Sequence, residues 1–597
     1  MMKKFLLVVC GSFVGVTLAL MVFTMSAVVM SFAIVGAMGA GESHSIDDNS
    51  ILHITLKGNI PERDGLADVS VTDLVRGVPA PPSLATLKAA IASAATSGKI
   101  DGIYLDCQGA SANPATLYEL RKSLADFKKT AGKSKFIYAY GGQAITQADY
   151  YVASVADSIF LNPIGAVDVH GLAAVIPSYK GLLDKLGVEM QVVRVGTFKS
   201  AVEPYILDSI SPANRLQQQQ YMGSIWDCMA SQMADSRKIQ RTDFDRLADS
   251  LLVALPADSL VKLHVVDALC YKSEMESRLR RESDVNEGDD LRLVDPADMA
   301  DSDAGHHSGK QGEIAVLYAV GEIDGARANG DGIESDDLID QIKKLRDDDD
   351  VKGLVLRVNS PGGSAYGSEQ IWKALDDFKR SGKPLAVSMG DLAASGGYYI
   401  SCGADRIFAE PVTITGSIGI FGMVPNLGGL FSDKLGVRFS VVKTNKNSDF
   451  GNFTKPLTPV QRAMMQAYVN RGYELFTKRC ADGRGMKQDS IKAIAEGRVW
   501  DGRTALSIGL IDEFGGIDDA VCYVAAKASL KSGQYATRCY PADTDRFSRL
   551  LQRYGGSEAA DSRLREQMGI FYSCYASLKR IMARDQMLCL MEPIEVK

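Results

Sequence analysis

Most of this chain is organised as two tandem copies of one sequence unit. Three segments recur in the same order, at offsets of 251, 248 and 249 residues. The matching pairs are Ile100–Leu105 with Val351–Leu356, Asp149–Asp157 with Gly397–Asp405, and Asp184–Val188 with Asp433–Val437. Ordered matches at nearly constant spacing indicate a tandem duplication, so the fold must be one that a single unit can form and a second unit can repeat.

Each copy alternates short β-branched runs with amphipathic segments. Leu87 and Ile91 lie four residues apart just before an apolar run, and Leu338 and Ile342 do the same in the second copy. This spacing places each pair on one helical face. Strand, helix and strand in repetition predict an α/β fold in which helices cover a largely parallel sheet. A chain of 597 residues is long enough for two or more such domains.

The repeat also predicts where the domains begin and end. We expect an anchor at 1–45, a first copy at 46–305, a second copy at 306–545 and a helical C-terminal tail at 546–597. Between the copies, Glu274–Gln311 is rich in charged residues and serine, which predicts a helix end followed by an exposed linker. His306 and His307 fall in this linker, where solvated side chains are more common than ligands. A packing or assembly role is the simplest expectation for the tail.

The N-terminal segment is typical of a membrane anchor. Residues 5–41 contain no charged side chain over 37 residues, which exceeds the roughly 7–15 apolar residues of a cleavable signal. A run of this length can span the bilayer's hydrocarbon core of about 30 Å. Lys3 and Lys4 precede it, so we expect the N-terminus to stay in the cytoplasm and the rest to cross the membrane. The Ala37–Ala40 segment resembles a signal-peptidase site, so a cleaved leader remains the alternative.

Composition excludes several classes of function. The net charge of −7, without a Lys/Arg-rich run or a basic stripe interleaved with aromatic residues, argues against a nucleic-acid partner. The ten cysteines show no C-x-x-C spacing, and the sequence contains no H-E-x-x-H motif. Free thiols are therefore expected rather than a metal site or a disulfide framework.

A candidate nucleophile stands among small residues in the second copy. Ser395 lies between two alanines and two glycines, where its hydroxyl is the reactive group. Upstream, an apolar strand runs into the turn Pro361-Gly362-Gly363, whose N–H groups could face an oxyanion. The alternative is a closely packed serine at a helix start and a turn without chemistry. Because residues 308–597 contain no histidine, any general base must come from elsewhere or be something other than imidazole.

The first copy lacks this serine. Alignment of the copies through Tyr150 and Tyr398 places Gln147 at the position of Ser395. The first copy also lacks the Pro-Gly-Gly turn and has Gly109–Ala112 in that neighbourhood. It therefore cannot supply its own nucleophile.

What the first copy keeps instead is a lysine. Lys199 aligns with Ser448 of the second copy. A lysine acts as a base only when its amine is neutral, so its ordinary pKa of about 10.4 must be lowered by burial. A solvated surface lysine is the alternative, but complementary loss of a serine and a lysine favours a pair shared between the copies. His170 is the rival candidate for the base.

These motifs resemble the signal peptide peptidase A family in its long, two-copy form, a serine protease family of the Clp protease and crotonase superfamily. The resemblance covers nearly the whole chain beyond the anchor. The motifs that carry it, in the family's order, are Phe198–Pro204, Asn359–Gly363, Ala393–Gly397 and Thr415–Gly419. The implied fold is a pair of tandem crotonase-like domains after an N-terminal transmembrane helix.

The resemblance also implies roles for individual residues. Ser395 would be the nucleophile and Lys199 the general base. The other implied site residues are Gly363, Gly362 and Gly396 in the oxyanion hole, and Ser417 as a hydroxyl that orients the amine. The implied acyl transfer requires no cofactor and no metal.

The expected substrates are cleaved signal peptides left in the membrane. The resemblance further implies a homo-oligomer, a tetramer in this family, and a bacterial inner membrane location with both copies on the periplasmic side. Two alternatives stay open. An acyl-CoA hydratase or thioesterase of the crotonase type shares the fold and a glycine oxyanion hole, although the anchor and the serine–lysine pairing argue against it. An inactive membrane scaffold of the same fold is the other, although a scaffold has no need of both halves of a dyad.

Overall fold

The computed structural model describes residues 46–64, 81–132, 134–301, 311–325, 332–541 and 588–591. The expected anchor, His306 and His307, and the expected tail apart from 588–591 lie outside these ranges. Within the described residues, no helix combines the length and the apolar character that crossing a membrane requires. The structural unit that begins at Asn49 contains both copies.

The first copy is built on a parallel sheet with the strand order β8-β5-β3-β2-β1-β9. Its strands are β1 (Ser50–Asn59), β2 (Ile100–Ser111), β3 (Phe136–Gly141), β5 (Ser158–Leu161), β8 (Ala268–Leu269) and β9 (Leu293–Val294), with a separate pair β4 (Ala144–Ile145) and β6 (Ala166–Val167). Its helices are α3 (Leu84–Thr96), α4 (Pro114–Ala131), α5 (Gln147–Ala153), α6 (Lys180–Leu186), α7 (Glu203–Ile206), α8 (Pro212–Arg237), α9 (Arg241–Asp249), α10 (Ala257–Lys262), α11 (Lys272–Glu282) and α12 (Pro296–Asp301).

The second copy repeats this order. Its sheet runs β17-β15-β13-β11-β10-β19, and β14 and β18 extend it beside β13. The strands are β10 (Gly312–Val320), β11 (Val351–Ser360), β13 (Leu385–Ala394), β14 (Arg406–Ala409), β15 (Ile414–Gly416), β17 (Val499–Asp501), β18 (Glu513–Phe514) and β19 (Tyr535–Tyr540). The helices are α13 (Ser335–Asp347), α14 (Ala365–Arg380), α15 (Gly396–Ser401), α16 (Pro459–Arg484), α17 (Gln488–Ile494), α18 (Gly502–Ser507) and α19 (Ile517–Lys527).

The correspondence between the copies extends to single hydrogen bonds. The hydroxyl of Tyr150 donates to the carbonyl of Val265 at 2.9 Å, and that of Tyr398 donates to the carbonyl of Leu510 at 2.9 Å. Both tyrosines lie in the short helix that follows the third strand of their copy's sheet. This helix is α5 in the first copy and α15 in the second. The predicted α/β fold with tandem repeats is therefore confirmed.

The predicted linker is partly wrong. Residues 293–294 form the edge strand β9, which pairs with β1, and α12 follows it with Met299 only 2% exposed. A strand of two residues is too short to show a periodic pattern. Pairing with β1 stabilises it, and its own sequence does not predict it. The charged stretch after α11 is therefore part of the first domain as far as Asp301.

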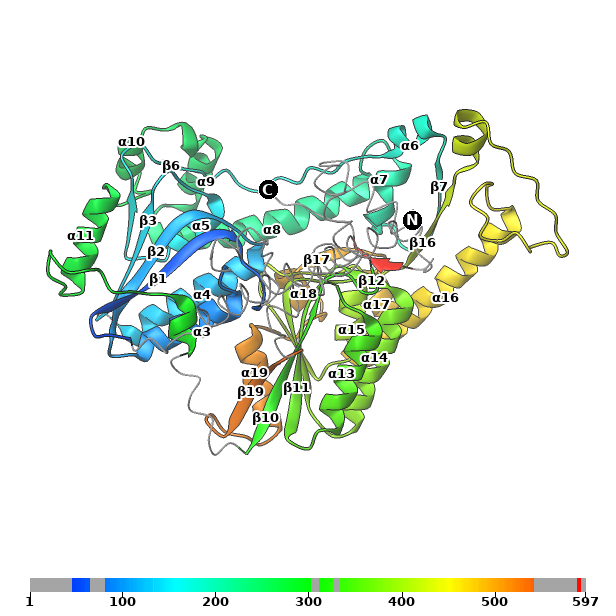
Figure 1. Cartoon of the computed structure of the whole chain (residues 1–597). Coiled ribbons are helices and arrows are strands. Elements are labelled where there is room, and N and C mark those ends of the chain that lie inside the picture. Colours follow the sequence, from blue (N-terminus) through cyan, green and yellow to red (C-terminus); the bar gives the residue numbers. More distant parts are fainter. Residues whose placement is uncertain are drawn as a thin grey trace, which may run out of the picture. The chain divides into compact units, whose positions relative to one another are not determined.

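A fourth sheet joins the two copies and the tail, with the order β12-β20-β16-β7. It contains β12 (Gly362–Ser364), β20 (Leu588–Leu590), β16 (Phe421–Asn426) and β7 (Glu189–Arg194). Figure 1 shows β7, from the first copy, beside β16 of the second. This sheet is where residues far apart in the sequence are brought to one place.

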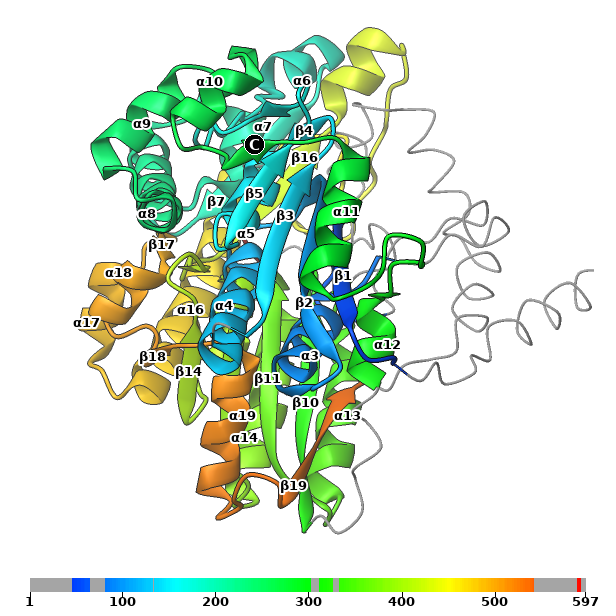
Figure 2. The same ribbon diagram turned by 90° about the vertical axis from the view of Figure 1, so that its left-hand side faces the viewer.

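Helices α3 and α4 of the first copy face the second copy (Figure 2). At the start of α4, the Thr116 amide and hydroxyl donate to the Asp391 carboxylate at 2.9 and 2.7 Å. Behind this contact, the fully buried Arg357 donates to Glu62 and Glu119 of the first copy at 3.0 and 2.6 Å. Burial alone would raise the pKa of Glu119, but Arg357 and Lys88 lower it to about 2. Removing one partner from such a buried ion pair typically costs about 3–5 kcal/mol, so the cluster fixes how the copies dock.

Candidate active site

Ser395 occupies the sharp turn between β13 and α15. Its side chain is fully buried, and its backbone has φ +57° and ψ −113°. The Ser395 amide donates to the carbonyl of Gly416 at 2.8 Å, which holds this conformation. Positive φ is uncommon for a residue with a Cβ and is found where surrounding structure enforces it, often at active sites. The turn therefore fixes the direction of the Ser395 hydroxyl.

Lys199 reaches this hydroxyl from the other copy. It follows β7 and precedes the short helix η1 (Ser200–Val202), and it is 1% exposed. Its Nζ lies 2.8 Å from the Ser395 Oγ and 3.1 Å from both the Oγ and the carbonyl oxygen of Ser417. The structure thus brings together three of the residues expected from the sequence.

The burial of Lys199 changes its protonation. Desolvation lowers the pKa of its amine to about 7, and the neighbouring Cys589 opposes this only partly. The hydrogen bonds described for the amine go to neutral groups, so no carboxylate holds its proton. A Cβ on Gly497 would lie 2.7 Å from the Lys199 Cβ, so a larger residue there would displace the lysine. An amine of this kind is neutral often enough near pH 7 to accept a proton.

The main chain around Lys199 is held by the second copy. β7 pairs antiparallel with β16, with Arg194 opposite Phe421. Phe198 then donates its amide to the carbonyl of Glu496 at 3.0 Å. From the first copy, Gln217 donates to the carbonyl of Phe198 at 3.2 Å. The lysine is therefore positioned by backbone contacts on both sides.

Two of the expected oxyanion glycines, Gly362 and Gly363, lie in β12 before α14, and the third, Gly396, begins α15. Gly362 has φ +97°, and its amide donates to the Ser360 Oγ at 3.1 Å, so this N–H is used within the turn. A Cβ on Gly362 would lie 2.1 Å from the carbonyl oxygen of Cys589 and 2.5 Å from the amide nitrogen of Gly396. A peptide carbonyl thus approaches the turn beside the Gly396 amide, and glycine at 362 permits it.

That carbonyl belongs to the chain's own C-terminal region. β20 lies antiparallel between β12 and β16, with Gly363 opposite Cys589 and Phe421 opposite Leu588. Met591 donates its amide to the carbonyl of Pro361 at 2.9 Å. β20 is therefore held by main-chain pairing as a strand added beside the Gly362–Gly363 turn. Sequence reasoning missed this strand, and its one signal is the apolar run Leu588–Met591.

Comparison with known proteins decides the family. A profile of peptidase family S49 matches residues 129–286 and 377–531, one stretch in each copy. The chain is 37% identical over 466 residues to Protease 4 of Salmonella typhi. The aligned region covers 75% of this chain and 72% of that protein. The chain belongs to peptidase family S49.

More distant and shorter relatives agree. The chloroplastic serine protease SPPA of Arabidopsis thaliana is 28% identical over 496 residues, which are 82% of this chain and 70% of that protein. A putative signal peptide peptidase SppA of Enterococcus faecium is 38% identical over 184 residues, or 31% of this chain and 53% of that protein. The chain is thus a serine protease of the two-copy S49 form, and this membership excludes the acyl-CoA alternative.

The first S49 copy has closed its equivalent of the site. Gln147, at the position of Ser395, accepts hydrogen bonds from the amides of His170 and Gly171 at 3.0 and 2.9 Å. In place of an open glycine turn, the amides of Gly109 and Ala110 donate to the carboxylate of Asp149 at 3.0 and 2.9 Å. The first copy has neither a nucleophile nor free turn amides at this position.

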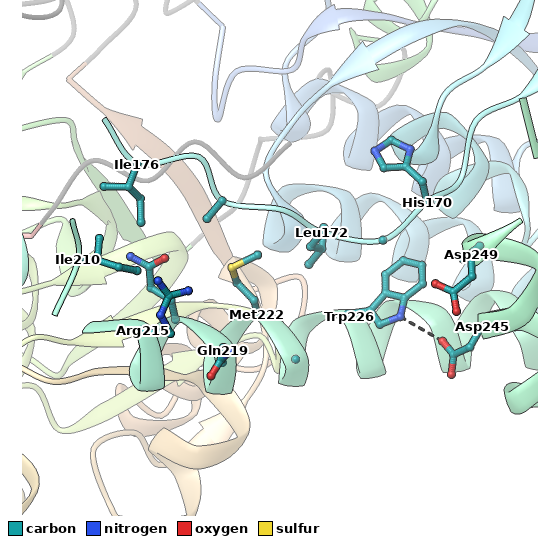
Figure 3. Close-up of a pocket in the computed structure, with 15 residues that line it drawn as sticks. His170, Leu172, Ile176, Ile210, Arg215, Gln219, Met222, Trp226, Asp245 and Asp249 are labelled. Carbon is teal, nitrogen blue, oxygen red and sulfur yellow. Dashed lines mark hydrogen bonds between the residues drawn. The ribbon is translucent and has the colours of Figure 1, made fainter. Parts of the chain in front are cut away.

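The two remaining candidates of the sequence lie elsewhere. Ser448, which aligns with Lys199, is exposed and accepts a hydrogen bond from the amide of Asn445 at 3.0 Å. His170 is half-exposed, with Nδ1 2.9 Å from a carboxylate oxygen of Asp168. Figure 3 shows His170 at one end of a cavity of ≈ 480 Å³ in the first copy. The side chain described at the Ser395 hydroxyl is Lys199, not this histidine.

Proposed function

We propose that this S49 protease cleaves peptides with Ser395 as nucleophile and Lys199 as general base. The observation that carries the proposal is the 2.8 Å contact between a serine hydroxyl and a buried amine whose pKa is lowered to about 7. A lysine desolvated in this way is one of the groups that can activate a serine. The rival base His170 has no such contact among the described residues.

The chemistry follows from this geometry. The neutral Lys199 Nζ takes the proton of the Ser395 hydroxyl as Oγ attacks the peptide carbonyl. The amides of Gly363 and Gly396 stabilise the negative charge that develops on the carbonyl oxygen. The protonated amine then gives its proton to the leaving nitrogen, and the acyl group stays on Oγ. A water molecule, deprotonated by the again neutral Lys199, hydrolyses the ester and restores the serine. The Ser417 hydroxyl, 3.1 Å from Nζ, orients the amine.

The substrates that we propose are apolar, extended peptides, with cleaved signal peptides as the physiological class. β20 supports this class, because an apolar segment of the chain lies between β12 and β16 as an added strand. Leu590 and Cys589 of this strand are 6% and 0% exposed, so the position between β12 and β16 buries apolar side chains. Main-chain pairing accepts many sequences, which suits an enzyme that degrades a mixed pool of apolar peptides.

Digestion of synthetic signal peptides tests this proposal. The full-length protein should cut them internally, and mass spectrometry should locate the cuts within the apolar core. A fluorophosphonate probe should label wild-type protein at Ser395 and leave Ser395→Ala unlabelled. Labelling without cleavage of any apolar peptide would contradict the substrate class, whereas absence of labelling would contradict the nucleophile. The second result would also revive the inactive scaffold.

The proposed location rests on the N-terminal sequence and on the family resemblance. Residues 5–41 would anchor the chain in the bacterial inner membrane, with Lys3 and Lys4 inside and both copies on the periplasmic side. A periplasm-dependent reporter fused after Lys597 should then be active, and a cytoplasm-dependent one inactive. The reverse pattern would overturn the orientation. We also propose a homo-oligomer, with four chains by resemblance to the family.

A further inference from the structure

A buried glutamine of α8 holds the main chain on both sides of Lys199. Gln217 is 2% exposed, and its Nε2 donates to the carbonyl of Phe198 at 3.2 Å and to the hydroxyl of Ser200 at 3.1 Å. The Oδ1 of Asn214 lies 3.2 Å from the same nitrogen, so the two N–H groups share three acceptors. Because the two residues bonded outside α8 are the chain neighbours of the lysine, this amide restricts the path of the backbone there.

The other end of the same side chain bonds to the second copy. The Oε1 of Gln217 accepts a hydrogen bond from the amide of Val499 in β17 at 3.1 Å. Val499 lies opposite Gly416 in the antiparallel pair of β17 with β15, and the carbonyl of Gly416 accepts the amide of Ser395 at 2.8 Å. One amide group therefore bridges the segment that carries Lys199 and the strand pair that holds the serine turn.

The start of α8 gives this glutamine a fixed base. Glu203, four residues after Lys199, accepts hydrogen bonds from the amide and the hydroxyl of Ser211 at 3.0 and 2.6 Å. It also accepts one from the side chain of Asn214 at 3.1 Å, and Asn214 in turn donates its amide to the hydroxyl of Ser211, the N-cap of α8. The first turns of α8 are thus tied to the chain that leaves the lysine, so Gln217 cannot follow a displaced segment freely.

The second copy shows that this glutamine is not needed to build the helix. Helices α8 and α16 both have 26 residues, and each starts with a proline that follows a serine or threonine N-cap. Counting from Pro212 and Pro459 places Met464 at the position of Gln217. Met464 is 59% exposed, whereas Gln217 is 2% exposed. The amide is thus found in the copy that keeps Lys199, and the helix forms without it in the other copy.

We propose that Gln217 is a positioning residue that sets the approach of the Lys199 amine to the Ser395 hydroxyl. The inference rests on the proposed function of these two residues and adds a side chain that touches neither reacting atom. Loss of the bridge frees the segment from β17, lengthens the contact between amine and hydroxyl, and admits water to the amine. Water at the amine favours its protonated form, which cannot accept the serine proton.

The charged groups around this segment stay in place when Gln217 is changed. Arg194 donates to the carbonyl of Lys199 at 3.1 Å and lies 4.0 Å from the carboxylate of Glu203. Among the described residues, the titratable group that acts on the amine itself is the thiol of Cys589 in β20. An uncharged substitution at Gln217 therefore tests position and solvation without adding or removing a charge.

Gln217→Met tests the proposal in the full-length protein. Methionine is unbranched and similar in length, so it fills the space and removes the amide. It is also the residue at the aligned position of the second copy. We expect kcat toward an apolar peptide to fall by about 10–100-fold at pH 7, because a small misplacement of a catalytic group is costly. KM should stay close to wild type, since the bridge lies outside β12 and β16.

The pH profile separates positioning from a loss of stability. Burial lowers the pKa of the wild-type Lys199 amine to about 7. An amine that water reaches has a higher pKa, so the midpoint of the rate profile should move upward in Gln217→Met and its deficit should shrink between pH 7 and 9. A loss of folded protein would lower the rate and leave the midpoint in place. Rates are normalised to the sites that a fluorophosphonate labels at completion.

Gln218→Met is the matched control on the same helix. Gln218 is 5% exposed and also donates to the Oδ1 of Asn214, at 3.1 Å, but its described hydrogen bond does not reach the segment around Lys199. This variant should keep the wild-type kcat and midpoint, whatever its Tm. An equal upward shift in both variants would mean that any buried polar loss in α8 disturbs the site, and it would overturn the assignment of Gln217.

Ser200→Ala supplies a milder variant that deletes a single oxygen. It removes one acceptor of Gln217, so the midpoint should move in the same direction by less, and adding it to Gln217→Met should cause no further loss of kcat. Independent, additive losses would refute the bridge, and so would a wild-type kcat and midpoint in Gln217→Met. Full activity in Lys199→Ala would instead contradict the proposed dyad, so the two failures give different results.

Discussion

Lys199 and Ser395 come from different copies of the repeat, and 196 residues of chain separate the two ends of their 2.8 Å contact. Each copy has lost the residue that the other keeps, with Gln147 in place of the serine and Ser448 in place of the lysine. The contact exists because β7 leaves its own copy and pairs with β16. Neither copy alone can therefore assemble the proposed dyad, and the docking of the copies is part of the active site.

Ser395→Ala should reduce the rate of peptide cleavage by about 10⁴-fold or more, because the nucleophile is removed while the buried turn loses a single oxygen. Circular dichroism and thermal unfolding should stay close to wild type. Gln147→Ala, at the equivalent position of the first copy, is the control and should retain activity. A Ser395→Ala protein that cleaves at near wild-type rate would shift attention to Ser364 or Ser417.

Lys199→Arg should be as inactive as Lys199→Ala, because a guanidinium keeps its proton and cannot act as a base. The wild-type rate should rise with pH through an apparent pKa of about 7, since burial lowers the pKa of the Lys199 amine to that value and only the neutral amine accepts the serine proton. Initial rates measured between pH 5 and 9 check both statements. A rate profile that shifts on changing His170 instead, or substantial activity in Lys199→Arg, would contradict the assignment.

Lys199→Met should stabilise the fold while abolishing activity. The folded pKa of Lys199 is lowered from 10.5 to about 7, so between these values the unfolded chain binds more protons and wild-type stability rises with pH. Below pH 7 the penalty is complete, on the order of 3–5 kcal/mol at about 1.4 kcal/mol per pKa unit. The apparent Tm of Lys199→Met should thus exceed that of wild type more at pH 6 than at pH 9.5. A gap that is constant with pH would mean that the lysine is not desolvated.

The repeat was predictable from matching segments at constant spacing, and the α/β fold from the alternation of strand and helix patterns. The meeting of Ser395 with Lys199 was predictable because aligned positions of the two copies differ in complementary ways. Roles in catalysis stay predictions, but the two side chains are where complementary loss placed them. The sequence could not predict that the Gly362 amide donates to the Ser360 hydroxyl instead of facing an oxyanion. This hydrogen bond depends on the orientation of one peptide group and not on residue type. Short strands escaped for another reason: β9 and β20 are stabilised by their partners, and two or three residues carry no period of their own.

Gly362→Ala should lower kcat by about 10²-fold or more, because the added Cβ would lie 2.1 Å from the carbonyl that approaches the turn and 2.5 Å from the Gly396 amide. Gly382→Ala is the matched control. Gly382 also has positive φ, at +90°, but a Cβ there meets nothing within 4 Å. It should therefore lose only about 1 kcal/mol of stability and keep its kcat. Equal kcat in both variants would show that no carbonyl is bound at the turn.

Removal of the C-terminal strand should raise the activity toward added peptides. β20 occupies the position between β12 and β16, so we expect that a substrate strand must displace it before a peptide carbonyl can reach Ser395. A chain that ends at residue 587 should accordingly show a lower KM, with kcat unchanged if the strand only competes for the cleft. A chain that ends at residue 591 keeps β20 and is the control for loss of the last residues. If the shorter chain binds peptides no better than the longer one, the strand does not compete with substrate; if kcat falls as well, β20 supports the turn at Gly363 and is part of the site.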